Sequence, residues 1–205
     1  MRCGSIRYLC LVLLCLNSSV LHAGTLLVLG DSLSAGYGIK AGSGWVNLLD
    51  QRLNTEGYDY RVINASVSGE TTAGGRARLP ALLKSHQPAI VIIELGANDG
   101  LRGLPILQLR SNLKAMILAA QSAKAKVLLV GMQIPPNYGD LYTNQFTSSF
   151  TDLANTHRVK LVPFFLEKVA LDSSLLQSDN LHPNERAQPL LLNTLWPQLK
   201  LLLSH

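Results

Sequence analysis

A serine, a histidine and an aspartate in this sequence have the residue types and surroundings that acyl transfer requires. Ser32 follows an apolar segment after Gly30 and Asp31 and precedes a predicted helical turn, which exposes its hydroxyl at the end of a strand. A serine hydroxyl is a weak nucleophile until a base accepts its proton, and His182 can be that base. Asp179 lies three residues before His182, in a turn closed by Pro183, so its carboxylate can reach the imidazole. We therefore expect Ser32, His182 and Asp179 to be catalytic.

The same chemistry needs N–H donors for the negatively charged oxygen of a tetrahedral intermediate. Gly69 can bring its backbone N–H close to a substrate because it has no Cβ, and Asn98 offers a side-chain N–H. The backbone N–H of Ser32 lies near a predicted helix N-terminus, where the helix dipole favours negative charge. We expect Ser32, Gly69 and Asn98 to form an oxyanion hole.

The elements that must bring these residues together are short apolar runs that alternate with amphipathic stretches. Apolar runs predict strands over residues 25–29, 60–63, 89–95, 126–130 and 159–162. Apolar residues at helical spacing predict helices over residues 45–53, 104–123, 142–155 and 189–203. This alternation predicts an α/β fold, a three-layer α/β/α arrangement around a five-stranded parallel sheet. Ligands of such sheets bind beyond the carboxyl ends of the strands, where the polar loops of this sequence lie.

Four blocks in this order resemble the SGNH (GDSL) hydrolase family. Gly30-Asp31-Ser32-Leu33-Ser34 is similar to the nucleophile block, and Gly69 falls on the second block. Gly96-Ala97-Asn98-Asp99 is similar to the third block, and Asp179 to His182 to the last. Shorter similarities, such as Asn137-Tyr138-Gly139, extend over almost all of the chain after residue 23.

The resemblance implies a flavodoxin-like SGNH hydrolase fold and a two-step acyl-enzyme mechanism. It implies that Ser32 is the nucleophile, that His182 is first base and then acid, and that Asp179 orients His182. It further implies a serine esterase of the lysophospholipase, arylesterase or thioesterase type that uses neither a metal nor a cofactor.

The loop after the fourth predicted strand is our candidate for substrate binding. The resemblance implies that it helps to form an acyl groove, with Ile134 and Pro135 as apolar wall and Tyr138 as an amphipathic one. A purely structural Pro-Pro turn is the alternative for this loop. We expect medium or long acyl esters, or a lysophospholipid, as substrates. Two other functions stay open: an SGNH esterase for carbohydrate O-acetyl groups and a non-catalytic lipid-binding module.

Three further carboxylates near the blocks have simpler explanations than catalysis. A Gly-Asp-Ser segment after a strand is often just a turn, and Asp31 fits the role of a loop-stabilising carboxylate. Asp99 fits a structural role beside Asn98. Glu94 lies inside an apolar strand, where an unpaired charge is costly, so we expect it to be paired or hydrogen-bonded near the site.

The first 23 residues have the pattern of a secretory signal peptide. Arg2 and Arg7 precede the apolar run 9–16, and Ala23 offers a small residue for cleavage. The run is far shorter than the ~20 residues of a membrane span, so we expect no stable membrane insertion after its removal. The three cysteines of the chain all lie in this segment. We expect an exported protein, periplasmic or secreted, whose remaining residues 24–205 form a single domain.

Composition limits the classes of partner. Hydrophobic residues make up 47% of the 205 residues and charged residues 15%, which argues against intrinsic disorder. Removing Arg2 and Arg7 lowers the formal net charge from +5 to +3, and the basic residues are scattered. This modest surplus does not predict nucleic-acid binding. We expect a small-molecule acyl ester or lysophospholipid as partner, and infer no obligate protein partner.

Overall fold

The computed structural model describes residues 24–204, at whose centre lies a parallel sheet of five strands. The strands are β1 (Gly24–Gly30), β2 (Tyr60–Asn64), β3 (Ile90–Glu94), β4 (Lys126–Val130) and β5 (Lys160–Val162). Their order in the sheet is β2-β1-β3-β4-β5, and every neighbouring pair is parallel. The predicted strands and the parallel sheet are confirmed. The predicted signal peptide, residues 1–23, lies outside the described residues.

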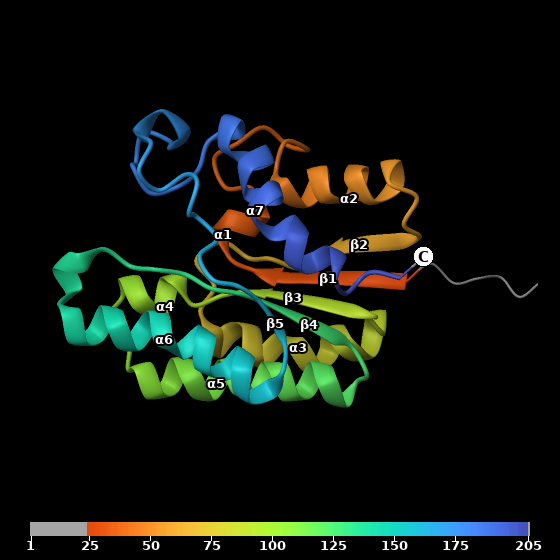
Figure 1. Cartoon of the computed structure of the whole chain (residues 1–205), viewed down its shortest axis with the longest axis horizontal. Helices are drawn as coiled ribbons and strands as arrows, with labels where there is room; N and C mark the ends of the chain where they lie inside the picture. Colours follow the sequence, from red (N-terminus) through yellow and green to blue (C-terminus); the bar gives the residue numbers. More distant parts are fainter. Residues whose placement is uncertain (1–23, 205) are drawn as a thin grey trace, which may run out of the picture.

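Helices cover both faces of this sheet, as Figure 1 shows. On one face lie α2 (Trp45–Thr55) and α7 (Gln188–Lys200). On the other lie α3 (Thr72–His86), α5 (Ile106–Ser122) and α6 (Asp140–His157). Two short helices, α1 (Ser32–Ala35) and α4 (Ala97–Leu101), directly follow β1 and β3. The predicted three-layer arrangement is therefore confirmed.

The sheet forms the middle of the hydrophobic core. All five residues of β3 are buried, and so are residues 26–30 of β1, because helices exclude water from both faces of these strands. Burial of each large aliphatic side chain contributes about 1.5–3 kcal/mol. A buried polar contact connects the two helices of one face: the Trp45 backbone N–H donates to Gln188 Oε1 at 3.0 Å. The start of α2 is thereby held against the start of α7.

Helix α3 is the one long helix whose residues the apolar spacing did not name. It contains Gly74, Gly75 and Pro80, which have the lowest helix propensities. Its N-cap compensates in part, because the Thr71 side chain accepts a hydrogen bond from the Gly74 N–H. Packing against α5 and β1, rather than local preference, therefore determines this helix.

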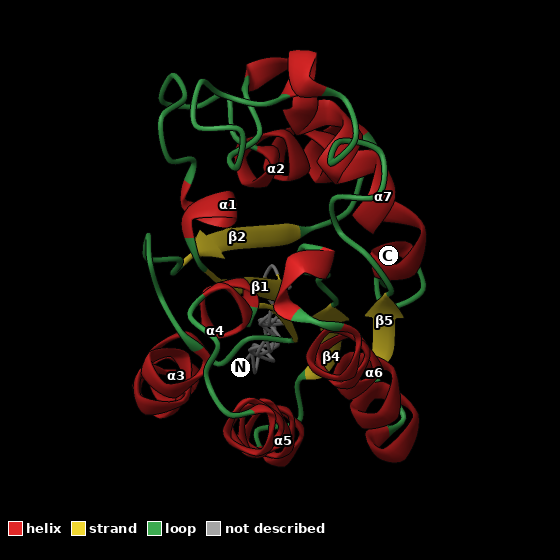
Figure 2. Ribbon diagram, turned by 90° about the vertical axis from the view of Figure 1, so that its left-hand side faces the viewer, coloured by secondary structure: helices red, strands yellow, loops and turns green. Residues whose placement is uncertain are grey.

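The carboxyl ends of the strands lie at one edge of the sheet, which faces the viewer in Figure 2. Helices α1 and α4 begin there, and so do the loops that follow β2 and β4. Among the described helices, none combines the length and the apolar character needed to cross a bilayer.

Candidate active site

Asp179 and His182 form a compact hydrogen-bonded turn between β5 and α7. Asp179 Oδ1 accepts hydrogen bonds from the backbone N–H groups of Leu181 at 2.9 Å and His182 at 3.0 Å. Its other oxygen, Oδ2, lies 2.6 Å from His182 Nδ1. The backbone and ring N–H groups of His182, together with the Leu181 N–H, lower the pKa of Asp179 to about 2. Asp179 is therefore a carboxylate at neutral pH.

His182 connects this turn to Ser32, which lies 150 residues earlier in the sequence. An ionised Asp179 can only accept, so the hydrogen of the neutral imidazole is on Nδ1. The lone pair of Nε2 then faces Ser32 Oγ, at a distance of 2.9 Å. This is the geometry in which a histidine accepts the proton of a serine hydroxyl.

Backbone contacts hold the His182 turn in place. The Gln177 backbone N–H donates to the His182 carbonyl at 2.7 Å, and its side chain donates to the carbonyls of Tyr37 and Pro183. The ring of Tyr37 lies beside the imidazole, with 4.7 Å between the two centroids. Neither Tyr37 nor Gln177 was predicted at this site, because no motif or periodicity in the sequence connects them to residue 182.

Ser32 is the first residue of α1, in a turn made by its two neighbours in sequence. Asp31 is the N-cap, and its Oδ1 accepts a hydrogen bond from the Leu33 N–H at 3.0 Å. The backbone N–H of Asp31 donates to Glu94 Oε2 at 3.3 Å. Asp31 thus stabilises the loop, in agreement with the sequence-based expectation.

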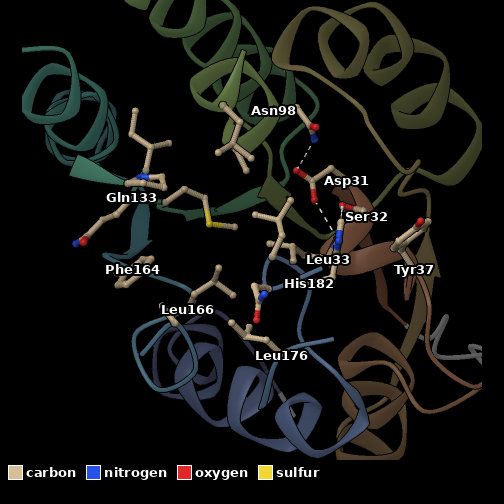
Figure 3. Close-up of a pocket in the computed structure, with 18 of the residues that line it drawn as sticks. Asp31, Ser32, Leu33, Tyr37, Asn98, Gln133, Phe164, Leu166, Leu176 and His182 are labelled. Carbon is tan, nitrogen blue, oxygen red and sulfur yellow. Dashed lines mark hydrogen bonds between the residues drawn. The ribbon is translucent and has the colours of Figure 1, made fainter. Parts of the chain in front are cut away.

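Asn98, in the first turn of α4, points towards the turn that carries Ser32, as Figure 3 shows. Its Nδ2 donates to Asp31 Oδ2 at 3.0 Å and to the Glu70 carbonyl at 3.0 Å. Burial raises the pKa of Asp31 to about 6, although the N–H groups of Leu33 and Asn98 oppose this shift. The contacts with Asp31 and Glu70 give an acceptor to each hydrogen of the Asn98 amide. An oxyanion that binds this amide must share a hydrogen with one of these acceptors or displace that acceptor.

Gly69 lies in the turn after β2, with a φ of +77°, a conformation that favours glycine. Arg102 Nη2 donates to the Gly69 carbonyl at 3.0 Å and so holds this turn. Within residues 24–204, no acceptor is found for the backbone N–H of Ser32 or of Gly69. Both residues line the same pocket, and neither N–H group has a competing acceptor, so both are candidates to bind a ligand oxygen.

A pocket of about 750 Å³ opens beside Ser32. Ser32 and Tyr37 lie at one end and Gln133 and Phe164 at the other, as Figure 3 shows. The wall between these ends is mainly apolar and includes Leu101, Met132, Ile134, Pro135, Leu166 and Leu176. This is space for an apolar chain whose polar end lies at Ser32.

Of the three predicted substrate-binding residues, the pocket contains two. Ile134 and Pro135 line it, but Tyr138 is not among its lining residues. The Tyr138 hydroxyl instead donates to the Leu101 carbonyl at 2.7 Å, and its ring stacks on Tyr142. The short helix Pro136–Tyr138 places this ring between α4 and α6, and a role of Tyr138 in substrate binding stays a prediction.

Asp99 and Glu94 are buried and form hydrogen bonds with residues near the site. Asp99 accepts hydrogen bonds from the backbone N–H and the hydroxyl of Thr72, and Asn112 donates to the same hydroxyl. Asp99 thereby connects α4 to α3 and α5, which is the structural role that we expected. Glu94, which is fully buried, lies 2.6 Å from Ser34 Oγ and confirms the expected hydrogen-bonded carboxyl. Across residues 24–204, no group of three or more His, Cys, Asp or Glu side chains is arranged to hold a metal.

Comparison with known proteins shows similarity over nearly the whole chain. Residues 28–189 match the GDSL-like lipase/acylhydrolase family. The chain is 53% identical to Esterase TesA of Pseudomonas aeruginosa over 194 residues, which cover 95% of this chain and 96% of that protein. It is 43% identical to Thioesterase 1/protease 1/lysophospholipase L1 of Escherichia coli over 97% of this chain and 93% of that one.

A solved structure is also similar. The psychrotrophic esterase EstA from a Pseudoalteromonas species, inhibited by monoethylphosphonate, superposes with a TM-score of 0.83. It is 46% identical in sequence, and the match covers 86% of this chain and 97% of that one.

Proposed function

This chain belongs to the GDSL-like lipase/acylhydrolase family and is an ester-hydrolysing enzyme, and we propose that Ser32, His182 and Asp179 carry out its reaction. The observation that supports these roles most directly is the 2.9 Å distance between His182 Nε2 and Ser32 Oγ. The 2.6 Å contact between His182 Nδ1 and Asp179 then supplies an orienting partner for the base. Nucleophile, base and orienting group thus form one continuous chain of hydrogen bonds.

In the first half of the reaction, Ser32 Oγ attacks the carbonyl carbon of the acyl ester as its proton moves to His182 Nε2. The resulting imidazolium is stabilised by the Asp179 carboxylate. When the tetrahedral intermediate collapses, the bond to the leaving alcohol or thiol breaks, and His182 returns the proton to that leaving group. The acyl group is now bonded to Ser32 Oγ as an ester.

In the second half, water replaces the leaving group. His182 Nε2 accepts a proton from the water as its oxygen attacks the acyl carbon. Collapse of the second tetrahedral intermediate releases the fatty acid and returns the proton from His182 to Ser32. The enzyme is restored without any other reactant.

The oxyanion of each intermediate is proposed to bind the backbone N–H groups of Ser32 and Gly69 and the Nδ2 of Asn98. The two backbone donors have no competing acceptor within residues 24–204. Asn98 does, because Asp31 Oδ2 and the Glu70 carbonyl lie 3.0 Å from its Nδ2. A developing negative charge is a stronger acceptor than a neutral carbonyl, so we propose that it displaces the contact with Glu70 and leaves Asp31 in place.

The acyl chain is proposed to lie along the pocket from Ser32 towards Phe164. The pocket of about 750 Å³ is much larger than an acetyl group requires, and its wall is mainly apolar. These properties support medium or long acyl esters, including lysophospholipids, over carbohydrate O-acetyl groups. The E. coli relative is named both a thioesterase and a lysophospholipase, which supports testing both kinds of bond.

We also propose that residues 1–23 are a cleaved signal peptide and that the enzyme acts outside the cytoplasm. The support is the basic start of this segment, its short apolar run and Ala23 at its end. Residues 24–205 then form a single catalytic domain. Amino-terminal sequencing of the exported protein would start at Gly24 if the cleavage follows Ala23.

The test is hydrolysis of p-nitrophenyl esters of graded acyl length, a lysophospholipid and an acyl thioester by residues 24–205. Ser32→Ala should lower kcat by about 10⁴-fold or more and abolish labelling by a fluorophosphonate, while the circular dichroism spectrum stays unchanged. A phosphonate is a suitable probe because the related EstA is inhibited by one. Retained activity in Ser32→Ala would refute the role of Ser32. A strict preference for acetyl esters would refute the proposed substrate class.

A further inference from the structure

A buried acid lies directly beneath the turn that carries Ser32. Glu94 ends β3, pairs in register with Gly30 of β1 and is fully excluded from solvent. A Cβ at Gly30 would lie 2.7 Å from Glu94 Oε2 and 2.6 Å from Ser34 Oγ, closer than real Cβ contacts. Only glycine at position 30 therefore leaves room for the Glu94 carboxyl under this turn.

One oxygen of Glu94 contacts the turn on both sides of the nucleophile. Oε2 lies 2.6 Å from Ser34 Oγ and 3.3 Å from the backbone nitrogen of Asp31. Asp31 directly precedes Ser32, and Ser34 follows it by two residues. Glu94 thus connects the turn that carries Ser32 to β3, the central strand of the sheet.

The other oxygen, Oε1, is buried and has no hydrogen-bond partner among residues 24–204. In this part of the chain, no lysine, arginine or histidine forms an ion pair with Glu94. A carboxylate spreads its charge over both oxygens, so an unpartnered and unpaired one is very costly to bury. A neutral carboxylic acid removes this charge, and its Oε2 can still accept hydrogen bonds from the Ser34 hydroxyl and the Asp31 N–H.

From these contacts we propose that Glu94 is a neutral carboxylic acid in the working enzyme and a positioning residue for the Ser32 turn. This inference rests on the proposed role of Ser32 as nucleophile. With a proton on Glu94, the carboxylate of Asp31 does not face a second negative charge at this position. Asp31 can then hold the Asn98 amide at the pocket, because a charged oxygen is the stronger acceptor.

The electrostatic surroundings agree with this assignment. Burial, as the main cause, and the nearby charge of Asp31, as the second, raise the pKa of Glu94 well above its ordinary value. The hydrogen bonds that Glu94 accepts from Ser34 and Asp31 only partly oppose this increase. The charge of His182 lowers the pKa of Asp31, and the charge of Asp99 raises it. Two adjacent buried carboxyls cannot both ionise at low cost, so the fully buried one keeps its proton.

The first experiment compares Glu94→Gln with the wild type by infrared difference spectroscopy at neutral pH. A protonated carboxyl has a carbonyl band above the amide region, and this band should be present in the wild type and absent from Glu94→Gln. Because glutamine keeps an oxygen for Asp31 and Ser34, kcat should stay within about threefold, and the acid limb of the kcat profile should not shift. Absence of the band, or an acid limb displaced by removal of a charge, would overturn the neutral state.

The second experiment tests positioning with Glu94→Met, which keeps the volume and removes the hydrogen bonds. We expect kcat and the rate of phosphonate labelling to fall together by about 10- to 100-fold, with KM changed by less than about threefold. Unchanged kcat would overturn the positioning role. If Glu94→Met does not fold, Ser34→Ala removes only one partner of the carboxyl and should lower kcat by about 3- to 10-fold; an unchanged kcat there would also overturn the role.

These results are separable from the fate of the proposed function. If Ser32→Ala stays active, the nucleophile assignment fails while the infrared band still reports the proton on Glu94. If Ser32→Ala is inactive and both Glu94→Met and Ser34→Ala behave as the wild type, only the positioning inference fails.

Discussion

Two aspartates of the proposed active site, Asp179 and Asp31, have opposite environments. Asp179 lies in a surface turn with 41% of its side chain exposed, and N–H donors from His182 and Leu181 lower its pKa to about 2. Asp31 is 1% exposed, and burial raises its pKa to about 6 despite two hydrogen bonds to its oxygens. The same functional group is thus easily ionised where water and donors surround it, and ionised at a cost where the fold encloses it.

This difference separates two roles. We propose that Asp179 supplies a charge that stabilises the imidazolium of His182 during the reaction. Asp31 supplies a fixed acceptor that orients Asn98 and caps α1. Replacement of Asp179 should therefore mainly affect the reaction rate, and replacement of Asp31 should affect both the rate and the stability.

Asp179→Asn should cause the largest loss. The asparagine amide can donate to His182 Nδ1, which places the imidazole hydrogen on Nε2 and removes the base facing Ser32. We expect kcat to fall by about 10³- to 10⁴-fold with KM nearly unchanged, as measured by p-nitrophenyl ester hydrolysis. The matched control is Asp172→Asn, an aspartate that caps a turn in the same region without contacting His182. Equal losses in both variants would mean that the loop fold, not the orientation of His182, is at fault.

Asn98→Ala should cause the next largest loss. Removal of its side-chain donor weakens oxyanion binding, and we expect kcat to fall by about 10²- to 10³-fold with little change in KM. Asn137→Ala, at an exposed position in the loop after β4, is the control and should retain activity. A change in KM alone would show that Asn98 binds the substrate in its ground state rather than the oxyanion.

Asp31→Asn should have a smaller effect on the reaction. Its Oδ1 can still accept from the Leu33 N–H, but its NH₂ then faces the Asn98 amide, which loses its acceptor. We expect kcat to fall by about tenfold. An activity equal to that of the wild type would show that Asn98 is oriented without Asp31.

The stability of Asp31→Asn provides an independent check of the same carboxylate. A carboxyl whose pKa rises from 3.8 when unfolded to about 6 when folded stabilises the protein below the unfolded value, and this contribution is lost as the pH rises through about 6. Two units correspond to about 2–3 kcal/mol. The free energy of unfolding can be measured with urea at about pH 4.5 and about pH 7.5. Relative to the wild type, the variant should have a higher free energy of unfolding at the higher pH than at the lower pH. A pH-independent difference would contradict the raised pKa.

The contribution of Asp179 to stability depends on pH in the opposite direction. Because its pKa is lowered, its contribution to folding is present above the unfolded value and is lost as the pH falls towards 2. The free energies of unfolding of the wild type and of Asp179→Asn should therefore differ most above about pH 4 and become more similar as the pH falls below it.

Much of the fold and of the site follows from local sequence. Apolar runs predicted the five strands within two residues at either end, and the blocks around residues 32, 69, 98 and 182 identified residues that border one pocket. Helix α3 was not located, because two glycines and a proline weaken its local signal. The contacts of Tyr138 with Leu101 and Tyr142 could not be predicted, because an amphipathic ring in a pocket loop and one that packs between helices have the same sequence signature.

By itself, the sequence determined the alternation of strands and helices, the family blocks and the types of chemistry available to Ser32, Asn98 and His182. Only the tertiary structure decided which atoms meet: that Asp31 accepts a hydrogen bond from Asn98, that Tyr37 lies beside His182, and that Glu94 lies buried under the turn that carries Ser32. The reason is physical. Strand and helix propensities act between near neighbours, whereas hydrogen-bond partners and burial depend on side chains brought together from distant parts of the chain.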